Sequence, residues 1–455
     1  MYVFRKYIVL FLSICFVVLF LSYIELNNAE TEPSPGMTIE PTILPTPKPT
    51  EDNDTTLPEY IGGSLSGPFE SSGDTVVYKV DNTTKEQYEH YVEKIMQKRF
   101  ENVLSNDVNG NLYNTFVKKD RLVHISYFKQ STSVIIVYET RGFLPKSVQK
   151  LNSKRKYQPL LTQIKLDSND MLEGMSYVFR LSDGSFFIID GGWPEKEHSE
   201  AKKLYNLLRE QTSEEEIVIQ GWLLTHCHSD HIGTFNDFVI QYHDKVTIKQ
   251  VLYNFPSDDD ILNSDSPHML DDHLGRYKTF KKVIGTYLYE TDIVKIHSGY
   301  KFNYVDAEIE ILQTHEDFYP ITIRDSGMNL SFVLFTVTIA EQRIIFLADA
   351  NEMANDRLVL NFGQYLKSDM MQVAHHGYSG GTVELYKIID AEYMLYPAPV
   401  EFYKGNLRHD HNRYFLFESK TVKQVFTMGF HQFTLPLPYT APEGAKRIPY
   451  NLFKH

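Results

Sequence analysis

A His-x-His-x-Asp-His segment directly after an apolar run most limits how this chain can fold. Residues 217–224 predict a buried strand, and the chain continues Thr-His-Cys-His-Ser-Asp-His-Ile-Gly. His226 and His228 lie two residues apart, so an extended loop presents both imidazoles on one side, where they can bind one metal ion. Asp230 and His231 follow at once and can bind a second ion. The predicted strand therefore ends at a polar site for one or two cations.

The sequence around this segment predicts sheets covered by helices. Residues 177–180 and 186–189 predict a hairpin around Asp183-Gly184, and residues 199–209 predict a helix. Hairpins followed by alternating strands and helices are typical of an α/β fold with helices packed on sheets. Further strands are expected at residues 247–253, 309–312, 332–338, 344–347 and 370–374.

The histidine–aspartate segment resembles the signature of the metallo-β-lactamase superfamily, with matching residues at His226, His228, Asp230 and His231. The resemblance covers residues 160–435. It implies an αββα sandwich, an α/β fold in which two sheets lie between two layers of helices. It also implies hydrolysis by a metal-bound hydroxide, because zinc lowers the pKa of its water from 15.7 to about 7.

The resemblance extends to two aspartates and a pair of histidines. The Ile-Ile-Asp-Gly-Gly segment around Asp190 is similar to the family's first motif, which implies that Asp190 orients the metal loop. The strand that ends at Asp349 is similar to the one that carries the bridging aspartate. His375 and His376 precede a glycine at the position of the family's last histidine ligand. We favour His375 as the ligand, with its neighbour in a supporting role.

The site implied by the resemblance holds two zinc ions. One ion is expected at His226, His228 and His375, the other at Asp230 and His231, with Asp349 bridging the two. Asp230 is also the expected catalytic residue, because it can orient the water and protonate the leaving group. Diiron oxidoreductases of this fold carry Glu at the position of His228, so His228 favours hydrolysis over redox chemistry.

One position departs from the family pattern. Most relatives carry a histidine in a Gly-His-Thr-like loop before the bridging aspartate, whereas residues 327–331 read Gly-Met-Asn-Leu-Ser. We therefore expect the second ion, at Asp230 and His231, to be held less tightly. His315 and the His-Asp-His-Asn segment at residues 409–412, which includes His409 and His411, are alternative ligands or substrate contacts.

The Asn-x-Ser, aspartate and His-His-Gly segments together resemble one branch of the superfamily, which includes the hydrolase domains of DNA-uptake channels and the phosphorylcholine esterases. This implies a phosphoester substrate outside the membrane, either a small molecule or an envelope component. A nuclease and a lactonase or β-lactamase are alternatives, and a surface binding or sensing module is the non-enzymatic one. The 45 basic and 59 acidic residues give a net charge of −14, which disfavours a nucleic acid partner.

The N-terminus predicts a membrane anchor over residues 1–29. Arg5 and Lys6 precede an almost continuous apolar run at residues 7–24, which is long enough to span a bilayer. Basic residues before the run place the N-terminus inside the cell and the remainder of the chain outside. A cleaved signal, which would make the protein secreted, is the alternative.

Three further segments are predicted after the anchor. Residues 30–57 contain six prolines among Thr, Glu and Asp, which predicts an extended linker. Residues 58–145 predict a small α+β domain, and residues 158–455 predict the hydrolase domain. The chain has only two cysteines, so a disulfide framework is excluded.

Overall fold

The computed structural model describes residues 54–148, 155–165, 174–194, 198–264, 267–321, 328–398, 405–427 and 432–448. From residue 54 onward, the described residues belong to one compact unit. The predicted anchor at residues 1–29 lies outside the described residues, as do residues 30–53 of the predicted linker at 30–57. Within the described ranges, the helices are too short or too polar to cross a membrane.

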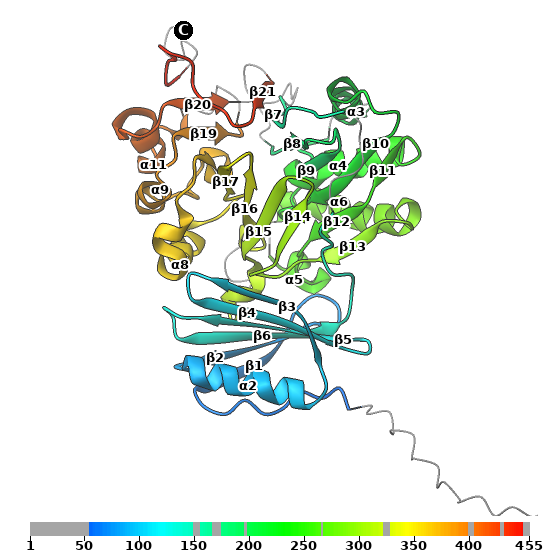
Figure 1. Ribbon diagram of the computed structural model, residues 1–455, viewed down its shortest axis with the longest axis vertical. Helices are drawn as coiled ribbons and strands as arrows, with labels where there is room; N and C mark the ends of the chain where they lie inside the picture. Colours follow the sequence, from blue (N-terminus) through cyan, green and yellow to red (C-terminus); the bar gives the residue numbers. More distant parts are fainter. Residues whose placement is uncertain are drawn as a thin grey trace, which may run out of the picture. The chain divides into compact units, whose positions relative to one another are not determined.

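A small antiparallel sheet with one helix begins this unit (Figure 1). Helix α2, Lys85–Gln97, starts at Thr84, whose side chain and that of Gln87 form a reciprocal capping box. The strands follow the order β1 Ser64–Glu70, β2 Val76–Asp81, β6 Ser133–Thr140, β5 Arg121–Phe128, β4 Asn111–Lys118 and β3 Glu101–Val108. Side chains alternate between the faces of β6, so Ile136 packs with the helix, whereas Ile135 packs with the larger part of the unit.

The second sheet carries the predicted histidine–aspartate segment. Its strands follow the order β13 Asp292–Lys295, β12 Gln250–Tyr253, β10 Ile217–Leu223, β9 Phe186–Ile189, β8 Tyr177–Arg180, β7 Leu160–Gln163 and β21 Phe433–Pro436, and β11 Val246–Ile248 also pairs with β10. The hairpin of β8 and β9 is the predicted one, and β9 continues into a parallel pairing with β10. The predicted strand at 247–253 is divided between β11 and β12.

The third sheet carries the other candidate ligands. It runs in the order β14 Lys301–Tyr304, β15 Ala307–Gln313, β16 Leu334–Ile339, β17 Gln342–Phe346, β18 Met370–Gln372, β19 Tyr393–Tyr396 and β20 Gln424–Thr427. The first four strands pair antiparallel, and the pairing becomes parallel from β17 onward.

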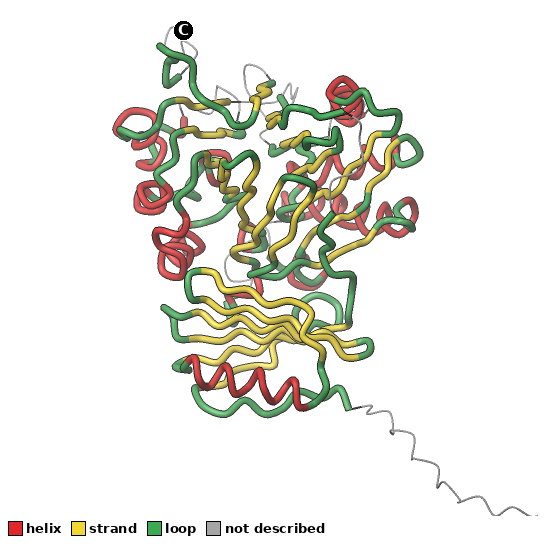
Figure 2. Tube along the Cα trace, in the orientation of Figure 1, coloured by secondary structure: helices red, strands yellow, loops and turns green. Residues whose placement is uncertain are grey.

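These two larger sheets pack face to face, with helices on both outer faces (Figures 1 and 2). Phe346 of the third sheet contacts Tyr177 of the second, with ring centroids 5.3 Å apart. On the outer face of the second sheet, Trp222 packs on Phe235 at 4.9 Å. The helices are α3 Ser199–Gln211, α4 Ser229–Tyr242 and α6 Pro267–Tyr287 on one side, and α8 Glu352–Phe362, α9 Val383–Ile389 and α11 Asp410–Arg413 on the other. The layers follow the predicted order of helix, sheet, sheet and helix.

The strand ends bring the candidate ligands to one edge of the sandwich. The parallel register pairs Leu223 with Ile189, so the residues after β10 and β9 lie together. In the third sheet, Ile345 pairs with Met371 in parallel strands, so the residues after β17 and β18 also lie side by side. Loops that follow parallel strands meet at the carboxyl edge of a sheet, where polar groups need not disturb the apolar core.

Candidate metal centre

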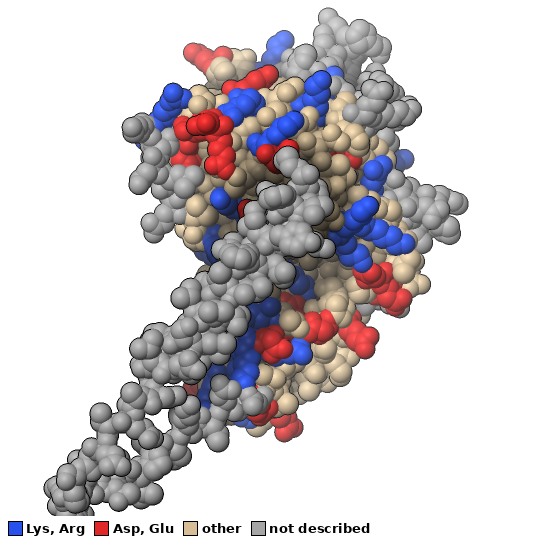
Figure 3. Space-filling view, turned by 90° about the vertical axis from the view of Figure 1, so that its right-hand side faces the viewer, with Lys and Arg blue, Asp and Glu red and all other residues tan. Residues whose placement is uncertain are grey.

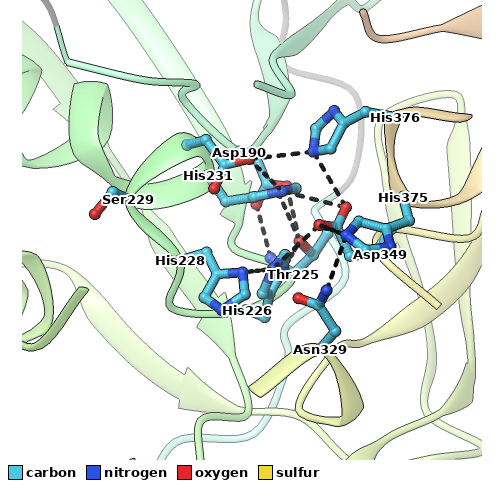
Figure 4. A network of polar contacts seen from close by, with 12 residues as sticks. Asp190, Thr225, His226, His228, Ser229, His231, Asn329, Asp349, His375 and His376 are labelled. Atoms are coloured by element: carbon cyan, nitrogen blue, oxygen red, sulfur yellow. Dashed lines mark hydrogen bonds and ion pairs between the residues drawn. The ribbon is translucent and has the colours of Figure 1, made fainter. Parts of the chain in front are cut away.

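Asp190 organises the loop that follows β10. It is fully buried and adopts a positive φ of 51° just after β9. Its Oδ1 accepts the backbone N–H of Thr225 at 2.7 Å, and its Oδ2 accepts the Thr225 hydroxyl at 2.7 Å. The same Oδ2 lies 2.6 Å from His231 Nδ1. Both oxygens are thus engaged by the metal loop, as expected for a residue that orients it (Figure 4).

The predicted His-x-His-x-Asp-His residues divide between a loop and a helix. His226 and His228 lie in the extended loop, with His226 Nε2 3.1 Å from His228 Nδ1. His228 is the N-cap residue of α4, so Asp230 and His231 fall in the first turn of that helix. After the sharp change from extended to helical backbone, all four side chains lie close to Asp349, two in each ligand group.

Asp349, three residues after β17, presents its two carboxylate oxygens to different histidines. Oδ1 lies 3.3 Å from His231 Nε2 and 3.3 Å from His376 Nε2. Oδ2 lies 3.7 Å from His226 Nε2 and 3.9 Å from His375 Nε2. The side chain is buried, and it stands between the two halves of the cluster (Figure 4).

His376 joins Asp230 and His231, whereas the favoured His375 lies on the side of Asp349 that faces His226. Its Nε2 lies 3.1 Å from Asp230 Oδ2, and its Nδ1 lies 2.8 Å from the carbonyl oxygen of Pro397. A hydrogen bond donated by Nδ1 leaves Nε2 as the nitrogen with the lone pair, which is the form that binds a metal. His375 lies beside it on the Oδ2 side of Asp349. The two residues diverge because both adopt left-handed backbone, with φ of 47° and 50°.

The ligand atoms form two groups that suit divalent cations. Asp230, His231, Asp349 and His376 offer one set of atoms, and His226, His228 and Asp349 offer another, each set within 4.8 Å. Within these sets, Nε2 of His231, Nε2 of His376 and Oδ1 of Asp349 are buried and make no hydrogen bond of acceptable geometry to any residue that the structure describes. Metal–nitrogen bonds of about 2.0–2.1 Å in tetrahedral geometry place neighbouring ligand atoms about 3.3 Å apart. The observed separations fit such an ion at each position.

The carboxylates also create a field that favours cations. Burial alone would lower the pKa of His231, but Asp349, Asp230 and Asp190 raise it to about 10. For His376, the same two carboxylates, Asp349 and Asp230, outweigh burial and hold its pKa well above the usual range. In turn these histidines hold the pKa of Asp349 well below its usual range despite its burial. A cation that replaces the histidine protons therefore enters a strongly negative site.

Comparison with protein families identifies this part of the chain. Residues 170–392 match the family model described as "Metallo-beta-lactamase superfamily". This part of the chain belongs to the superfamily. A comparison with curated protein sequences gives no match.

Several solved structures resemble the chain distantly. The metallo-β-lactamase fold protein YhfI from Bacillus subtilis is 14% identical, with a TM-score of 0.37, over 61% of this chain and 99% of that one. The diiron β-hydroxylase CmlA from Streptomyces venezuelae is 13% identical, with a TM-score of 0.30, over 57% and 45%. Human tRNase Z, short form, is 11% identical, with a TM-score of 0.29, over 52% and 90%. At these values the likenesses do not bear on the substrate or metal of this chain.

Other histidines singled out in the sequence lie away from the two ligand groups. His315 lies 3.3 Å from Ser71 Oγ, against the small sheet. His409 and His411 line a cavity of about 460 Å³ together with Arg408 and Glu352. Of this late segment, Asn412 touches the metal-binding turn, since its side chain donates to the carbonyl of Gly377 at 2.6 Å.

Two residues near the metallo-β-lactamase site were missed by the sequence analysis. His273 of α6 stacks on His228 with ring centroids 4.2 Å apart, and its Nδ1 accepts the backbone N–H of Ser229 at 3.1 Å. Asn329 donates through Nδ2 to His375 Nε2 at 3.0 Å. Residue 273 carries no motif, because its contact depends on how α6 packs on α4. Asn329 had a signal, since it occupies the loop where a histidine was expected.

Proposed function

We propose that the chain is a hydrolase that uses two divalent cations, with zinc as the preferred metal, to cleave a phosphoester. The observation that carries this proposal is the arrangement of Asp349, whose two oxygens face two different sets of histidines. A carboxylate in that position can bridge two ions, and paired ions suit the attacking and leaving oxygens of a phosphoryl displacement.

The residues that would hold the ions follow from the two ligand groups. Asp230, His231 and His376 would hold one ion with Asp349 Oδ1, and His226 and His228 would hold the other with Asp349 Oδ2. Two bound cations supply a water that is deprotonated near neutral pH, and positive charge for the oxygens of the phosphoryl group. Most of these ligands are neutral imidazoles, which leave the cations much of their charge. His228 in place of a glutamate supports zinc over iron.

Asp230 is the residue we assign to proton handling. Burial would raise the pKa of its carboxyl group, but His231 and His376 lower it well below the usual range. The ionised carboxylate can accept a hydrogen bond from an attacking water and pass the proton to the leaving group. Its side chain is 12% exposed, whereas that of Asp349 is 2% exposed, so Asp230 is the better placed of the two for substrate.

The cavity lined by His409 and His411 supports a phosphoester with a polar leaving group. It is bordered by residues 379 and 381–383, which follow the His375–His376 turn directly. Arg408 lines the same cavity, and a guanidinium matches the geometry of phosphate oxygens. The predicted anchor supports a location outside the cytoplasm, with an envelope component or an external small molecule as substrate.

Charge supports a small substrate over a nucleic acid. The net charge of the chain is −14. The face in Figure 3 shows Lys and Arg side chains interspersed with Asp and Glu. A nucleic acid backbone is bound by a continuous basic surface, which this face does not provide among its described residues.

Metal content and hydrolysis of the purified chain test the proposal. We expect two zinc ions per chain and hydrolysis of bis(p-nitrophenyl) phosphate. His226→Ala and Asp230→Asn should each reduce the rate by more than the 10–100-fold that residues around metal ligands typically contribute. The matched control is His90→Ala on α2, because that side chain is 55% exposed and lies in the small sheet region. Opening of lactones without cleavage of phosphodiesters would refute the phosphoester assignment, and failure to bind any metal would refute the hydrolase.

A further inference from the structure

The small antiparallel sheet packs against a turn that leads toward the metal centre, although none of its described residues belongs to either ligand group. This turn consists of the 3₁₀ helix η2, His315–Phe318, and the following Tyr319. The ring of Tyr319 stacks on Phe69 of β1 with centroids 5.6 Å apart. Just after β1, Ser71 Oγ lies 3.3 Å from His315 Nε2. The turn is therefore attached to the end of β1.

The same turn also contacts the segment that supports the metal loop. Phe318 packs edge-on against Phe332, with ring centroids 6.2 Å apart. The N–H of Val333, the next residue, donates to the carbonyl of Thr225 at 2.9 Å. Thr225 directly precedes His226, the first histidine of the metal motif. One aromatic contact thus joins the turn held by the small sheet to the loop that presents the histidines.

Arg357 of α8 connects the small sheet to the other half of the centre. Its guanidinium lies 5.5 Å from the ring centroid of Phe128 in β5 and 5.3 Å from that of Phe318. A guanidinium close to two aromatic rings is attracted by the faces of both. Helix α8 starts three residues after Asp349, and it lies beside the small sheet in Figure 1. The position of the bridging carboxylate is therefore linked to the small sheet through one helix.

The two aromatic contacts are the main restraint on the Arg357 side chain within the described structure. Its Nε atom is buried and has no hydrogen-bond partner among the described residues. Arg357 also forms no ion pair with any of them. Cation–π attraction is stronger where water is excluded, so the rings of Phe128 and Phe318 fix the guanidinium. A shift of the small sheet would thus be passed to α8 and to η2 together.

We propose that the small sheet positions the two halves of the metal centre relative to each other. Through Arg357 it holds α8, which follows the bridging Asp349. Through the turn at Phe318 it holds the segment that supports the loop of His226 and His228. The sheet thus sets the geometry between the ligand groups without contacting an ion or a substrate. The inference rests on the proposed function only in requiring that the chain bind metal, and it does not depend on the substrate.

Visible absorption of the full chain loaded with cobalt tests this role at two neighbouring residues of β6. Ile135 is buried against the sandwich, whereas Ile136 is buried against α2. Ile135→Ala and Ile136→Ala remove the same atoms from opposite faces of the sheet, so both should lower the midpoint of urea unfolding. Only Ile135→Ala should also shift the cobalt absorption bands, which report the geometry around the ions, and weaken cobalt binding several-fold.

Arg357 variants test the aromatic contacts directly. We expect Arg357→Met to shift the cobalt bands and to lower kcat for bis(p-nitrophenyl) phosphate by about tenfold, with little change in KM. Arg357→Lys, which keeps a cation near the rings, should show a smaller effect. Phe128→Leu in the Arg357→Met background should add little, because both changes remove one contact. The matched control is Arg121→Met, since Arg121 lies 5.5 Å from the ring centroid of Tyr138 within the small sheet.

Two outcomes would overturn the positioning role. One is unchanged cobalt bands and affinity in folded Ile135→Ala and Arg357→Met proteins, which would leave the small sheet a role in stability alone. The other is an equal shift in Ile136→Ala and Arg121→Met. Circular dichroism shows whether each variant is folded, and Ile135→Val with Ile136→Val replaces the alanine pair if either is not. Cobalt shifts as expected, in a chain that never cleaves phosphodiesters, would refute the proposed reaction and leave the positioning role standing.

Discussion

Asp190 and Asp349 are both buried aspartates just beyond strand ends, yet their surroundings differ. The oxygens of Asp190 are hydrogen-bonded to Thr225 and His231, whereas Oδ1 of Asp349 makes no hydrogen bond within the described part of the chain. Asp190→Asn should lower zinc affinity by about 10–100-fold through misplacement of the loop. Asp349→Asn should lower it further, because an amide removes a charge between two cations. Competition with a chelator measures both, and equal losses would contradict the roles given to these residues.

His273 offers a second prediction that concerns a single side chain. His273→Phe retains a ring that can pack on His228 but removes the acceptor for the Ser229 N–H. We expect a loss of about 1–3 kcal/mol in the free energy of unfolding, as for other buried hydrogen bonds, together with weaker metal binding. His273→Gln, which can still accept the N–H, serves as the control in urea unfolding. A larger loss in His273→Gln than in His273→Phe would show that packing of the ring, not the hydrogen bond, matters.

Single residues also mark where sequence reasoning ends. The spacing of His226, His228, Asp230 and His231 predicted a shared site, because a two-residue period in extended backbone is predictable from chemistry alone. The choice between His375 and His376 was not predictable in that way. They are neighbours in one segment, and the left-handed turn that separates them is accompanied by close packing of Gly380 and a backbone hydrogen bond to Ala348, which the local sequence does not show.

Side chains at the turn between β3 and β4 donate hydrogen bonds to the C-terminal end of helix α8. This helix starts three residues after Asp349. Asn109 donates to the carbonyl of Phe362, and Asn111 to that of Asn361, each at 3.0 Å. The last carbonyls of a helix have no partner within it, so these side chains complete the end of α8. The small sheet is therefore attached to the helix that follows the bridging aspartate.

Asn111→Ala should lower the stability of the sandwich by about 1–3 kcal/mol, because Asn111 is fully buried and leaves a carbonyl without its donor. Tryptophan fluorescence reports the sandwich alone, since both tryptophans of the chain, Trp193 and Trp222, lie there. The control is Asn102→Ala, whose described contacts stay within the small sheet. An unchanged fluorescence transition in Asn111→Ala would mean that the small sheet and the sandwich unfold independently.

Helices and strands with strong local patterns were the most predictable elements. The helix predicted at 199–209 is present as α3, and the strand predicted at 217–224 is present as β10. Strands such as β7, β19 and β21 were missed, because each is only four residues long and is defined by its neighbours in the sheet. Local sequence cannot show pairing between residues 160 and 436, which the register of β7 and β21 requires.

The small sheet and the sandwich share a buried ionic cluster. Lys295 lies 2.8 Å from Glu139 and 2.8 Å from Glu316, while His297 lies 3.1 Å and 2.6 Å from the same two carboxylates. His124 of the small sheet stacks on His297 at 5.0 Å. Two anions and two cations thus balance, and no sequence motif predicts them, because Glu139 and Lys295 are 156 residues apart.

This cluster makes the stability of the molecule depend on pH. Burial would lower the pKa of His297, but Glu316 and Glu139 raise it to about 9. Burial would raise the pKa of Glu139, but Lys295 and His297 lower it to about 2. The stability that His297 gains from its raised pKa is complete below the ordinary histidine pKa of about 6.5, and it is lost as the pH rises through 9. The stability that Glu139 gains from its lowered pKa is complete above the ordinary glutamate pKa of about 4.5, and it is lost as the pH falls toward 2.

Both contributions are therefore complete only between about pH 4.5 and 6.5. His297→Gln should lower the free energy of unfolding by roughly 3 kcal/mol near pH 5.5. This difference from the unsubstituted protein should narrow toward pH 9. Urea unfolding of both proteins between about pH 5.5 and 9 measures this difference in unfolding free energy. For the control His90→Gln, a substitution at an exposed histidine, the difference in unfolding free energy from the unsubstituted protein should be near zero at every pH. A difference in unfolding free energy that does not change with pH would mean that His297 stabilises the protein by packing rather than by charge.

The left-handed turn at His375 and His376 has a consequence for how the cations arrive. If consecutive residues carry one ligand for each ion, the first ion to bind immobilises the backbone that the second ion also needs immobilised. The entropy lost in ordering the turn is then lost once, and the two binding events become positively cooperative. Linkage requires the coupling to be reciprocal, so whichever ion is removed first loosens the other by the same factor.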